Sequence, residues 1–256
     1  MAAGAGALLV ADAGKLPAGV SAVVVDDTRL ALGRLAAAWR ARFALPVIAV
    51  TGSNGKTTTK EMIAAILKVA HGAAVLSTRG NLNNDIGLPL MLLRLSGNHR
   101  AAVIEMGMNH PGEIGYLTRL AQPTVALVNN AQRAHLQGMG SVNEVAREKG
   151  AIYDGLSTGG VAVINADDAF AGYWKAINVG RETLTFGLSE DADVTARCTS
   201  HGFASDLVLS APQGEARFRL QVPGLHNVRN ALAASAACLA AGVSLDAVAA
   251  GLGAYT

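Results

Sequence analysis

The chain has 256 residues, 51% of them hydrophobic, and a formal net charge of +2. This composition is inconsistent with an intrinsically disordered protein, and the lysines and arginines are too scattered to predict nucleic-acid binding. The two cysteines, Cys198 and Cys238, lie far apart in the sequence and predict neither a disulfide framework nor a metal site.

No segment has the features of a membrane anchor. The first residues lack the basic region and sustained apolar core of a signal peptide. The most apolar stretch, residues 231–243, is alanine-rich and too short to span a bilayer. We therefore expect a cytoplasmic protein without membrane insertion, and a monomer.

The segment before Pro46 differs from the rest. Residues 6–10 and 21–25 are predicted strands, and residues 28–43 a predicted helix. About 45 residues are too few for a comfortable independent domain. We expect residues 1–45 to be the end of an N-terminal domain, and residues 46–256 to form a central domain.

From Pro46 onward, short β-branched runs alternate with helical patterns. Strands are predicted at 47–51, 74–78, 101–106, 124–130 and 161–168. Strands that alternate with helices of this length indicate a mostly parallel α/β sheet covered on both faces. Four more short strands between 183 and 222 suggest an antiparallel flap or edge addition, and two helices follow at 227–242 and 244–253.

The strongest motif is VIAVTGSNGKTTTK, in which a buried strand leads through Gly52 and Gly55 into a helix. Glycines let backbone amides approach an anion, and the helix N-terminus favours negative charge. Lys56 would reach the β- and γ-phosphates, while the Thr57 hydroxyl would bind Mg²⁺. The strict phosphate-loop pattern needs glycine at position 50, which is valine here, so a plain glycine-rich turn is the alternative.

Polar residues follow the neighbouring strands. Glu105 ends one strand, where ligands gather in open α/β sheets, although a surface carboxylate would look the same. Asn129, Asn130 and then His135 follow the next strand. A lone histidine is usually structural, and Lys149 alone would be taken for a surface charge.

Several motifs in this order together resemble the Mur ligase family: TGSNGKTTTK, GNLNNDIGLPL, VIEMGMNHPGEI, ALVNNAQRAHLQGMGS, AREKGAIYDGL, NADD and PGLHNVRNALAA. The resemblance covers residues 46–256, and the segment before it is similar to the end of the family's N-terminal domain. GNLNNDIGLPL and EMGMNHPGEI are particular to the branch that adds D-alanyl-D-alanine. In this family the valine departure disappears, because xTGxNGKT is the normal loop.

The resemblance implies a role for each matching position. Lys149 takes the place of a lysine that is carbamylated on its amine, and it would act in catalysis with Lys56 and His135. Mg²⁺ would be bound by Thr57, Glu105, His135 and Lys149. ATP would be bound by Gly52, Ser53, Asn54, Gly55, Lys56, Thr57, Thr58, Asn227 and Asn230, and the muramoyl-peptide substrate would face Asn83 and Asn84. Asp167 and Asp168 either border the nucleotide or simply form a turn.

The implied activity is an ATP-dependent ligation in peptidoglycan precursor synthesis. Such enzymes join D-alanyl-D-alanine to UDP-MurNAc-tripeptide through an acyl phosphate. The resemblance also implies that a C-terminal domain is absent, so we expect this chain alone to bind nucleotide weakly without ligating. The alternatives are another ligase of the family, for example of the folylpolyglutamate type, a nucleotide-binding module without ligase chemistry, and a transport-type ATPase.

Overall fold

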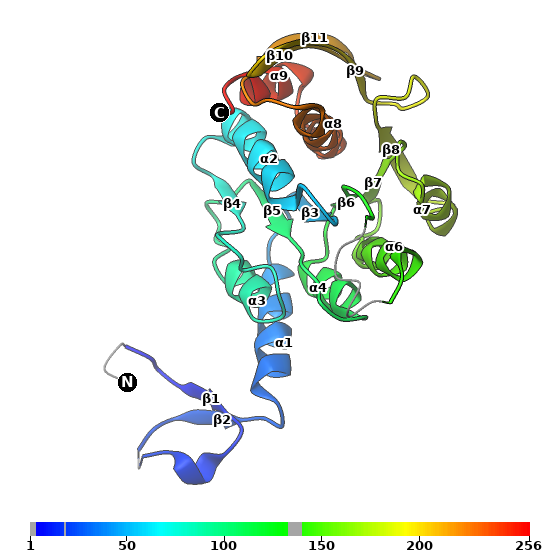
Figure 1. Cartoon of the computed structure of the whole chain (residues 1–256). Helices are drawn as coiled ribbons and strands as arrows, with labels where there is room; N and C mark the ends of the chain where they lie inside the picture. Colours follow the sequence, from blue (N-terminus) through cyan, green and yellow to red (C-terminus); the bar gives the residue numbers. More distant parts are fainter. Residues whose placement is uncertain (1–3, 18, 133–139) are drawn as a thin grey trace.

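The computed structural model describes residues 4–17, 19–132 and 140–256. Its centre is a sheet of six parallel strands in the order β4-β5-β3-β6-β7-β8 (Figure 1). The strands are β3 (Val47–Thr51), β4 (Val75–Ser77), β5 (Ala101–Glu105), β6 (Val125–Val128), β7 (Val161–Asn165) and β8 (Glu182–Phe186). The predicted mostly parallel α/β fold is confirmed.

The strands are buried on both faces because their side chains alternate between two hydrophobic cores. On β3, Ile48 and Val50 belong to one core, whereas Val47 and Ala49 belong to the other. A strand with apolar neighbours on both faces needs a continuous apolar sequence rather than an alternating one. This requirement explains why VIAVT lacks the polar positions of a half-exposed strand.

Helices form the two outer layers. One face of the sheet is covered by α2 (Lys56–His71), α8 (Leu225–Ala240) and α9 (Leu245–Gly253). The other face is covered by α1 (Thr28–Arg40), α3 (Gly87–Leu92), α4 (Glu113–Ala121), α6 (Val142–Gly150), the 3-10 helix η2 (Ala151–Gly155) and α7 (Ala171–Ile177). No helix in the described ranges combines the length and apolar character needed to cross a bilayer.

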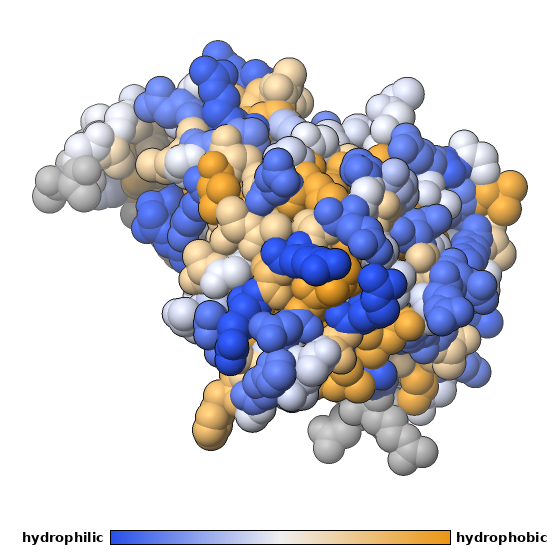
Figure 2. Space-filling view, turned by 90° about the horizontal axis from the view of Figure 1, so that it is seen from above, coloured by the Kyte–Doolittle hydropathy of each residue, from blue (hydrophilic) through white to orange (hydrophobic). Residues whose placement is uncertain are grey.

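A three-stranded antiparallel sheet, in the order β11-β10-β9, lies over α8 and α9 (Figure 1). It comprises β9 (Thr195–His201), β10 (Ala204–Ala211) and β11 (Gly214–Leu220). Of the four strands that the sequence grouped together, these three form the antiparallel addition. The fourth, β8, instead extends the parallel sheet, because Val161 to Asn165 pair with it in parallel register. Hydrophilic residues alternate with hydrophobic ones on this upper side of the molecule (Figure 2).

At the other end of the molecule, β1 (Leu8–Val10) and β2 (Ala22–Val24) form a small parallel sheet, with the 3-10 helix η1 (Ala13–Lys15) between them. Figure 1 shows this sheet beside the start of α1, away from the six-stranded sheet. The opposite end of α1 is held tightly, since Arg40 Nε donates to the carbonyl of Ala121 at 2.8 Å and Trp39 Nε1 to that of Leu95 at 2.9 Å. Residues 28–40 therefore pack on the same core as the central sheet, and the proposed boundary at residue 45 stays a prediction.

Candidate functional site

The glycine-rich loop joins β3 to α2 at the carboxyl edge of the sheet. Gly55 has a φ of 75°, in the left-handed region that favours glycine. A Cβ at this position would lie 2.4 Å from Asn230 Oδ1 and 2.7 Å from Asn129 Nδ2. The N-cap residue Gly55 offers no side-chain cap, and in the described part of the chain the first N–H groups of α2 are left for an anion.

Asparagine side chains hold this loop in place. The main-chain carbonyl of Asn130 accepts from the backbone N–H of Ser53, and its side-chain Oδ1 accepts from the backbone N–H of Asn54, both at 2.9 Å. Asn129 Nδ2 donates to the carbonyl of Asn54 at 2.9 Å and to Asn230 Oδ1 at 3.0 Å. The segment after β6 thus binds the loop directly, and Asn230 of α8 in turn binds Asn129.

Glu105 lies at the end of β5 and is 2% exposed. Its Oε2 accepts from Thr57 Oγ1 at 3.0 Å, and its Oε1 accepts from Asn83 Nδ2 at 2.7 Å. Its backbone N–H donates to Thr78 Oγ1 at 2.9 Å. Two segments that are distant in sequence, which carry Thr57 and Asn83, thus meet at one carboxylate.

Lys56 folds back over the loop. Its Nζ donates to the carbonyl of Gly52 at 2.6 Å and to that of Ser53 at 3.4 Å. Burial lowers the pKa of Lys56, and the nearby charge of Glu105 opposes that shift. Among the described residues, the ammonium therefore has only neutral carbonyl acceptors, with which a phosphate oxygen would compete favourably.

Lys149 and Glu148 are neighbours on α6, and both are buried. Lys149 is 1% exposed, and burial together with the positive charge of Lys56 lowers its pKa to about 7, with Glu148 opposing the shift. The Glu148 carboxylate accepts from the backbone N–H groups of Gly112 and Ile114, both at 2.8 Å. Glu148 thereby caps the start of α4, where a negative charge is favoured.

Two clefts flank the phosphate loop. The first, which we call the amide cleft, has a volume of about 520 Å³ and is lined by Asn54, Gly55, Asn129, Asn130, Gln132, Asn165, Asp167, Asp168, His226, Arg229 and Asn230. The second, the charged cleft, has a volume of about 380 Å³ and is lined by Arg29, Lys56, Asn83, Asn84, Asp85, Gly107, Met108, Asn109, His110, Glu113, Leu117 and Lys149. Lys56 and Lys149, predicted to act together, therefore share one cleft.

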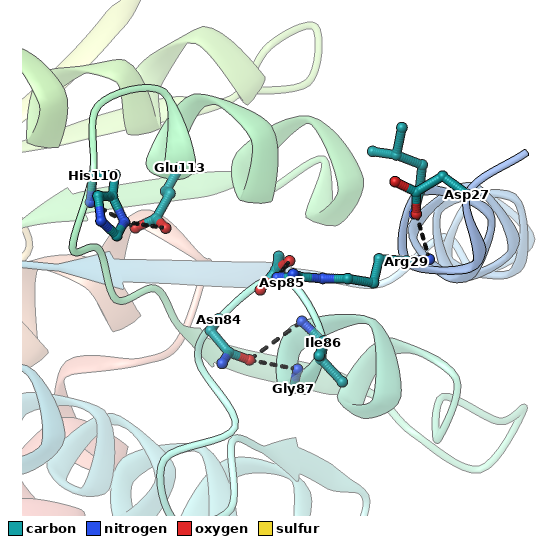
Figure 3. Close-up of polar contacts among 9 residues, drawn as sticks. Asp27, Arg29, Asn84, Asp85, Ile86, Gly87, His110 and Glu113 are labelled. Carbon is teal, nitrogen blue, oxygen red and sulfur yellow. Dashed lines mark hydrogen bonds and ion pairs between the residues drawn. The ribbon is translucent and has the colours of Figure 1, made fainter.

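Figure 3 shows part of the wall of the charged cleft. Arg29 extends from α1 and forms an ion pair with Asp85, which lies in the segment before α3. Across the cleft, His110 Nδ1 lies 3.3 Å from Glu113 Oε1. Helix α1 thus contributes a cation to a cleft that is otherwise built by residues beyond Pro46.

The two asparagines predicted to face the substrate have different contacts. Asn83 binds Glu105, as described above, whereas Asn84 Oδ1 accepts from the backbone N–H groups of Ile86 at 3.2 Å and Gly87 at 2.8 Å. Asn84 therefore stabilises the first turn of α3. Both residues line the charged cleft.

The remaining predicted residues are distributed around the loop. Asn227 accepts from Asn230 Nδ2 at 3.4 Å and lies just beyond the lining of the amide cleft. Ser53 Oγ donates to the carbonyl of Gln132 at 3.1 Å. Thr58 is half-buried in the first turn of α2. His135 lies outside the described residues.

The side chains around the loop show whether a divalent cation could bind here. Within the described ranges, no three Asp, Glu, His or Cys side chains form a group that could hold a metal. Thr57 and Glu105 do supply two oxygen donors 3.0 Å apart beside the phosphate loop. Mg²⁺ prefers oxygen ligands and commonly completes its shell with water and phosphate, so these two residues fit it.

Thr78 and Glu148 are among the site residues that were not identified from the sequence. Thr78 is the last residue of a predicted strand, and its place at the strand end was the available signal. Glu148 pairs with backbone groups 34 and 36 positions away, and no sequence pattern indicates such a contact.

The parallel sheet, the glycine loop and the lysine at the start of α2 define the phosphate-loop class of α/β domains. A family model described as the Mur ligase middle domain matches residues 50–238. The chain belongs to the Mur ligase family.

The relatives agree with this assignment. The chain is 46% identical over 255 residues to the UDP-N-acetylmuramoyl-tripeptide--D-alanyl-D-alanine ligase of Escherichia coli (strain K12), which covers 98% of this chain and 55% of the relative. A crystal structure of MurF from Acinetobacter baumannii is similar with a TM-score of 0.91 at 42% identity, covering 97% of this chain and 54% of the other. MurF ligase from Thermotoga maritima in complex with ADP gives a TM-score of 0.80 at 27% identity, covering 96% and 57%. The chain spans about half the length of the curated relatives it matches.

Proposed function

We propose that this chain is the nucleotide-binding part of an ATP-dependent ligase that joins D-alanyl-D-alanine to UDP-MurNAc-tripeptide in peptidoglycan precursor synthesis. The convergence of Lys56, Thr57 and Glu105 between the two clefts carries the proposal. The names of the relatives support the choice of substrates. The proposal includes a monomer that works in the cytoplasm.

In the proposed reaction, a carboxylate oxygen of the tripeptide attacks the γ-phosphorus of ATP, and the bond to the β-phosphate oxygen breaks to release ADP. The amine of D-alanyl-D-alanine then attacks the acyl carbon, loses a proton, and phosphate leaves as the amide bond forms. Lys56 would stabilise the charge on the transferring oxygens. The amide cleft would take the nucleoside, and the charged cleft would hold the tripeptide carboxylate near Asn83 and Asn84.

Thr57 and Glu105 would hold Mg²⁺, with His135 and Lys149 as the further ligands that the family resemblance implies. Bound Mg²⁺ neutralises negative charge on phosphate oxygens. Lys149 would serve as a ligand after its neutral amine adds to CO₂ and loses a proton, which converts a cation into a carbamate anion. Its burial and lowered pKa support this step, because only the neutral amine is nucleophilic.

The modification can be tested on the chain itself. Incubation with ¹³C-labelled bicarbonate is expected to give one carbamate carbon signal in the ¹³C NMR spectrum. Lys149→Met should remove the signal, and Lys175→Met, which changes an exposed lysine on α7, should leave it. A signal that persists in Lys149→Met would contradict the assignment.

The activity can be tested in two stages. Calorimetry should show that the chain binds ATP and ADP in the presence of Mg²⁺ and that Lys56→Ala weakens this binding. Phosphate release should then be measured for the chain and for a chimera in which it replaces the matching segment of the Escherichia coli relative. We expect release by the chimera only when both UDP-MurNAc-tripeptide and D-alanyl-D-alanine are present, and little release by the chain alone. Nucleotide binding without release in the chimera would instead indicate a binding module.

A further inference from the structure

A groove on the side of the molecule opposite to β8 has no part in the proposed reaction. It has a volume of about 560 Å³ and follows the edge strand β4. Its floor is formed by Val75 to Gly80, one wall by Glu61 and Lys68 of α2, and the other by Arg94 and His99 between α3 and β5. We call it the β4 groove.

The floor of the β4 groove exposes main-chain hydrogen-bonding groups. Within the ranges that the structure describes, β4 is the last strand of the sheet and pairs only with β5, on its inner side. The carbonyl of Ala74 and the N–H of Thr78 bond to the β5 side, at 2.8 and 3.1 Å. Because successive residues of a parallel strand direct their main-chain groups to opposite sides, those of Val75 and Ser77 face the groove.

The walls of the groove are positively charged. Lys68, Arg79 and Arg94 are exposed, and no carboxylate in the described part of the chain forms an ion pair with any of them. The acidic residue among the lining residues, Glu61, is already paired with Lys60. The groove therefore carries cations on both walls and near the end of its floor, and the floor exposes main-chain groups of β4 that no other described strand pairs with.

We propose that the β4 groove binds an extended acidic segment of a protein partner, which adds to the sheet as a strand beside β4. Main-chain bonds to Val75 and Ser77 supply part of the binding, and acidic side chains of the segment pair with Lys68, Arg79 and Arg94. A phosphate group would satisfy the cations but leave the outward carbonyls of the strand unpaired. An acidic peptide can pair with the cations and also form hydrogen bonds with the outward main-chain groups of β4.

The same cations determine which segments are excluded. Short edge strands flanked by lysine and arginine discourage pairing between copies of a chain, because like charges meet. An acidic segment escapes this repulsion. The cations therefore allow β4 to stay accessible without promoting self-association.

The groove also lies close to the candidate site. Thr78, which lies in the floor, accepts from the backbone N–H of Glu105, and the segment that follows carries Asn83, which donates to the Glu105 carboxylate. A strand that docks on β4 thus contacts the segment that holds a proposed Mg²⁺ ligand.

The test is an NMR titration of the ¹⁵N-labelled chain with a blocked seven-residue peptide of alternating glutamate and valine. We expect amide shifts in residues 74–80 and slower hydrogen exchange at Val75 and Ser77, because their N–H groups become bonded. The lysine–valine counterpart should cause neither effect. Binding should weaken as salt is added.

Variants distinguish binding in this groove from non-specific attraction of an acidic peptide to the protein surface. The double change Arg79→Glu with Arg94→Glu should weaken binding about tenfold or more, since two favourable charge pairs become repulsive. Arg217→Glu, at an exposed arginine on β11, is the matched control and should leave affinity unchanged. Inorganic pyrophosphate is the second probe.

Three results would overturn the proposal. The first is an absence of shifts at residues 74–80, and the second is equal loss of binding in Arg217→Glu. The third is binding of pyrophosphate at these residues without any effect of the peptide, which would indicate an anion site. All three readouts are independent of nucleotide binding at Lys56.

Discussion

The amide cleft and the charged cleft lie on either side of one loop, yet they are built by different physical means. Neutral side chains dominate around Asn129 and Asn230, where each amide group is already bonded to another part of the protein. In the charged cleft, Lys56 and Lys149 lose hydration on burial, and the pKa of each is lowered. The first arrangement stabilises the fold before any ligand binds, whereas the second holds charges that a ligand would stabilise.

The largest expected effect is on ATP binding, after a substitution in the charged cleft. Lys56→Ala removes the cation that lies over the loop, and we expect affinity for ATP to fall about a hundredfold, or ~2.7 kcal/mol. Isothermal titration calorimetry measures the change. Lys175→Ala, at an exposed lysine on α7, is the control and should bind normally. Equal affinity in Lys56→Ala would place the phosphates elsewhere.

The buried Lys149 of the charged cleft should make the stability of the protein depend on pH. Its pKa is lowered from 10.5 to about 7 in the folded protein, so between these values the unfolded state binds more protons. The free energy of unfolding should therefore rise with pH across this window, by at most about 1.4 kcal/mol per pH unit, and level off outside it. Lys149→Met should lack this rise.

Urea unfolding of both proteins in CO₂-depleted buffer from pH 7 to 9 measures the difference. The depletion matters because carbamylation would remove the ammonium form. Parallel stability curves for the two proteins would show that Lys149 is not desolvated as described.

Asn230→Ala breaks the amide cleft. It leaves Thr59 Oγ1 and one donor of Asn129 without their acceptor. Loss of these buried hydrogen bonds should reduce the free energy of unfolding by about 1–2 kcal/mol and weaken ADP binding several-fold. Denaturant unfolding checks the first value and calorimetry the second. Asn227→Ala is the control at a more exposed position, and a larger loss there would contradict the role given to Asn230.

The smallest effect concerns the support of the charged cleft. Glu148→Gln removes one acceptor and the negative charge at the start of α4, which should cost about 1 kcal/mol. Thermal unfolding should show a lower Tm than for Glu144→Gln, an exposed carboxylate on the same helix. If both variants unfold at the same temperature, the cap contributes little.

The sequence predicted local features better than distant contacts. The strand, loop and helix around Lys56 follow from β-branched residues, two glycines and helical periodicity within a few positions. By contrast, the contact of Asn83 with Glu105 joins residues 22 positions apart, and the side chains of Arg29 and Asp85 meet across 56 positions. Such contacts depend on how the crossover connections pack, which periodicity does not specify.

The grouping of β8 with the antiparallel strands has a similar cause. All four segments are short and lie between turn residues, so they look alike in sequence. Their pairing differs because β8 completes an open edge beside β7, while β9 to β11 pair with one another. The predicted roles of Lys149 and His135 came from family resemblance, since isolated lysine and histidine residues have no local pattern.

Gly55 has no side chain, and the groups packed against it bear on the order of folding. The space that a Cβ would occupy holds amide groups from Asn129 and Asn230, so residues separated by 175 positions meet at one point. A nascent chain that has completed β3 and α2 still lacks this neighbour until α8 is made. Tight nucleotide binding should therefore arise only late in synthesis, which makes it a reporter of complete assembly rather than of early folding.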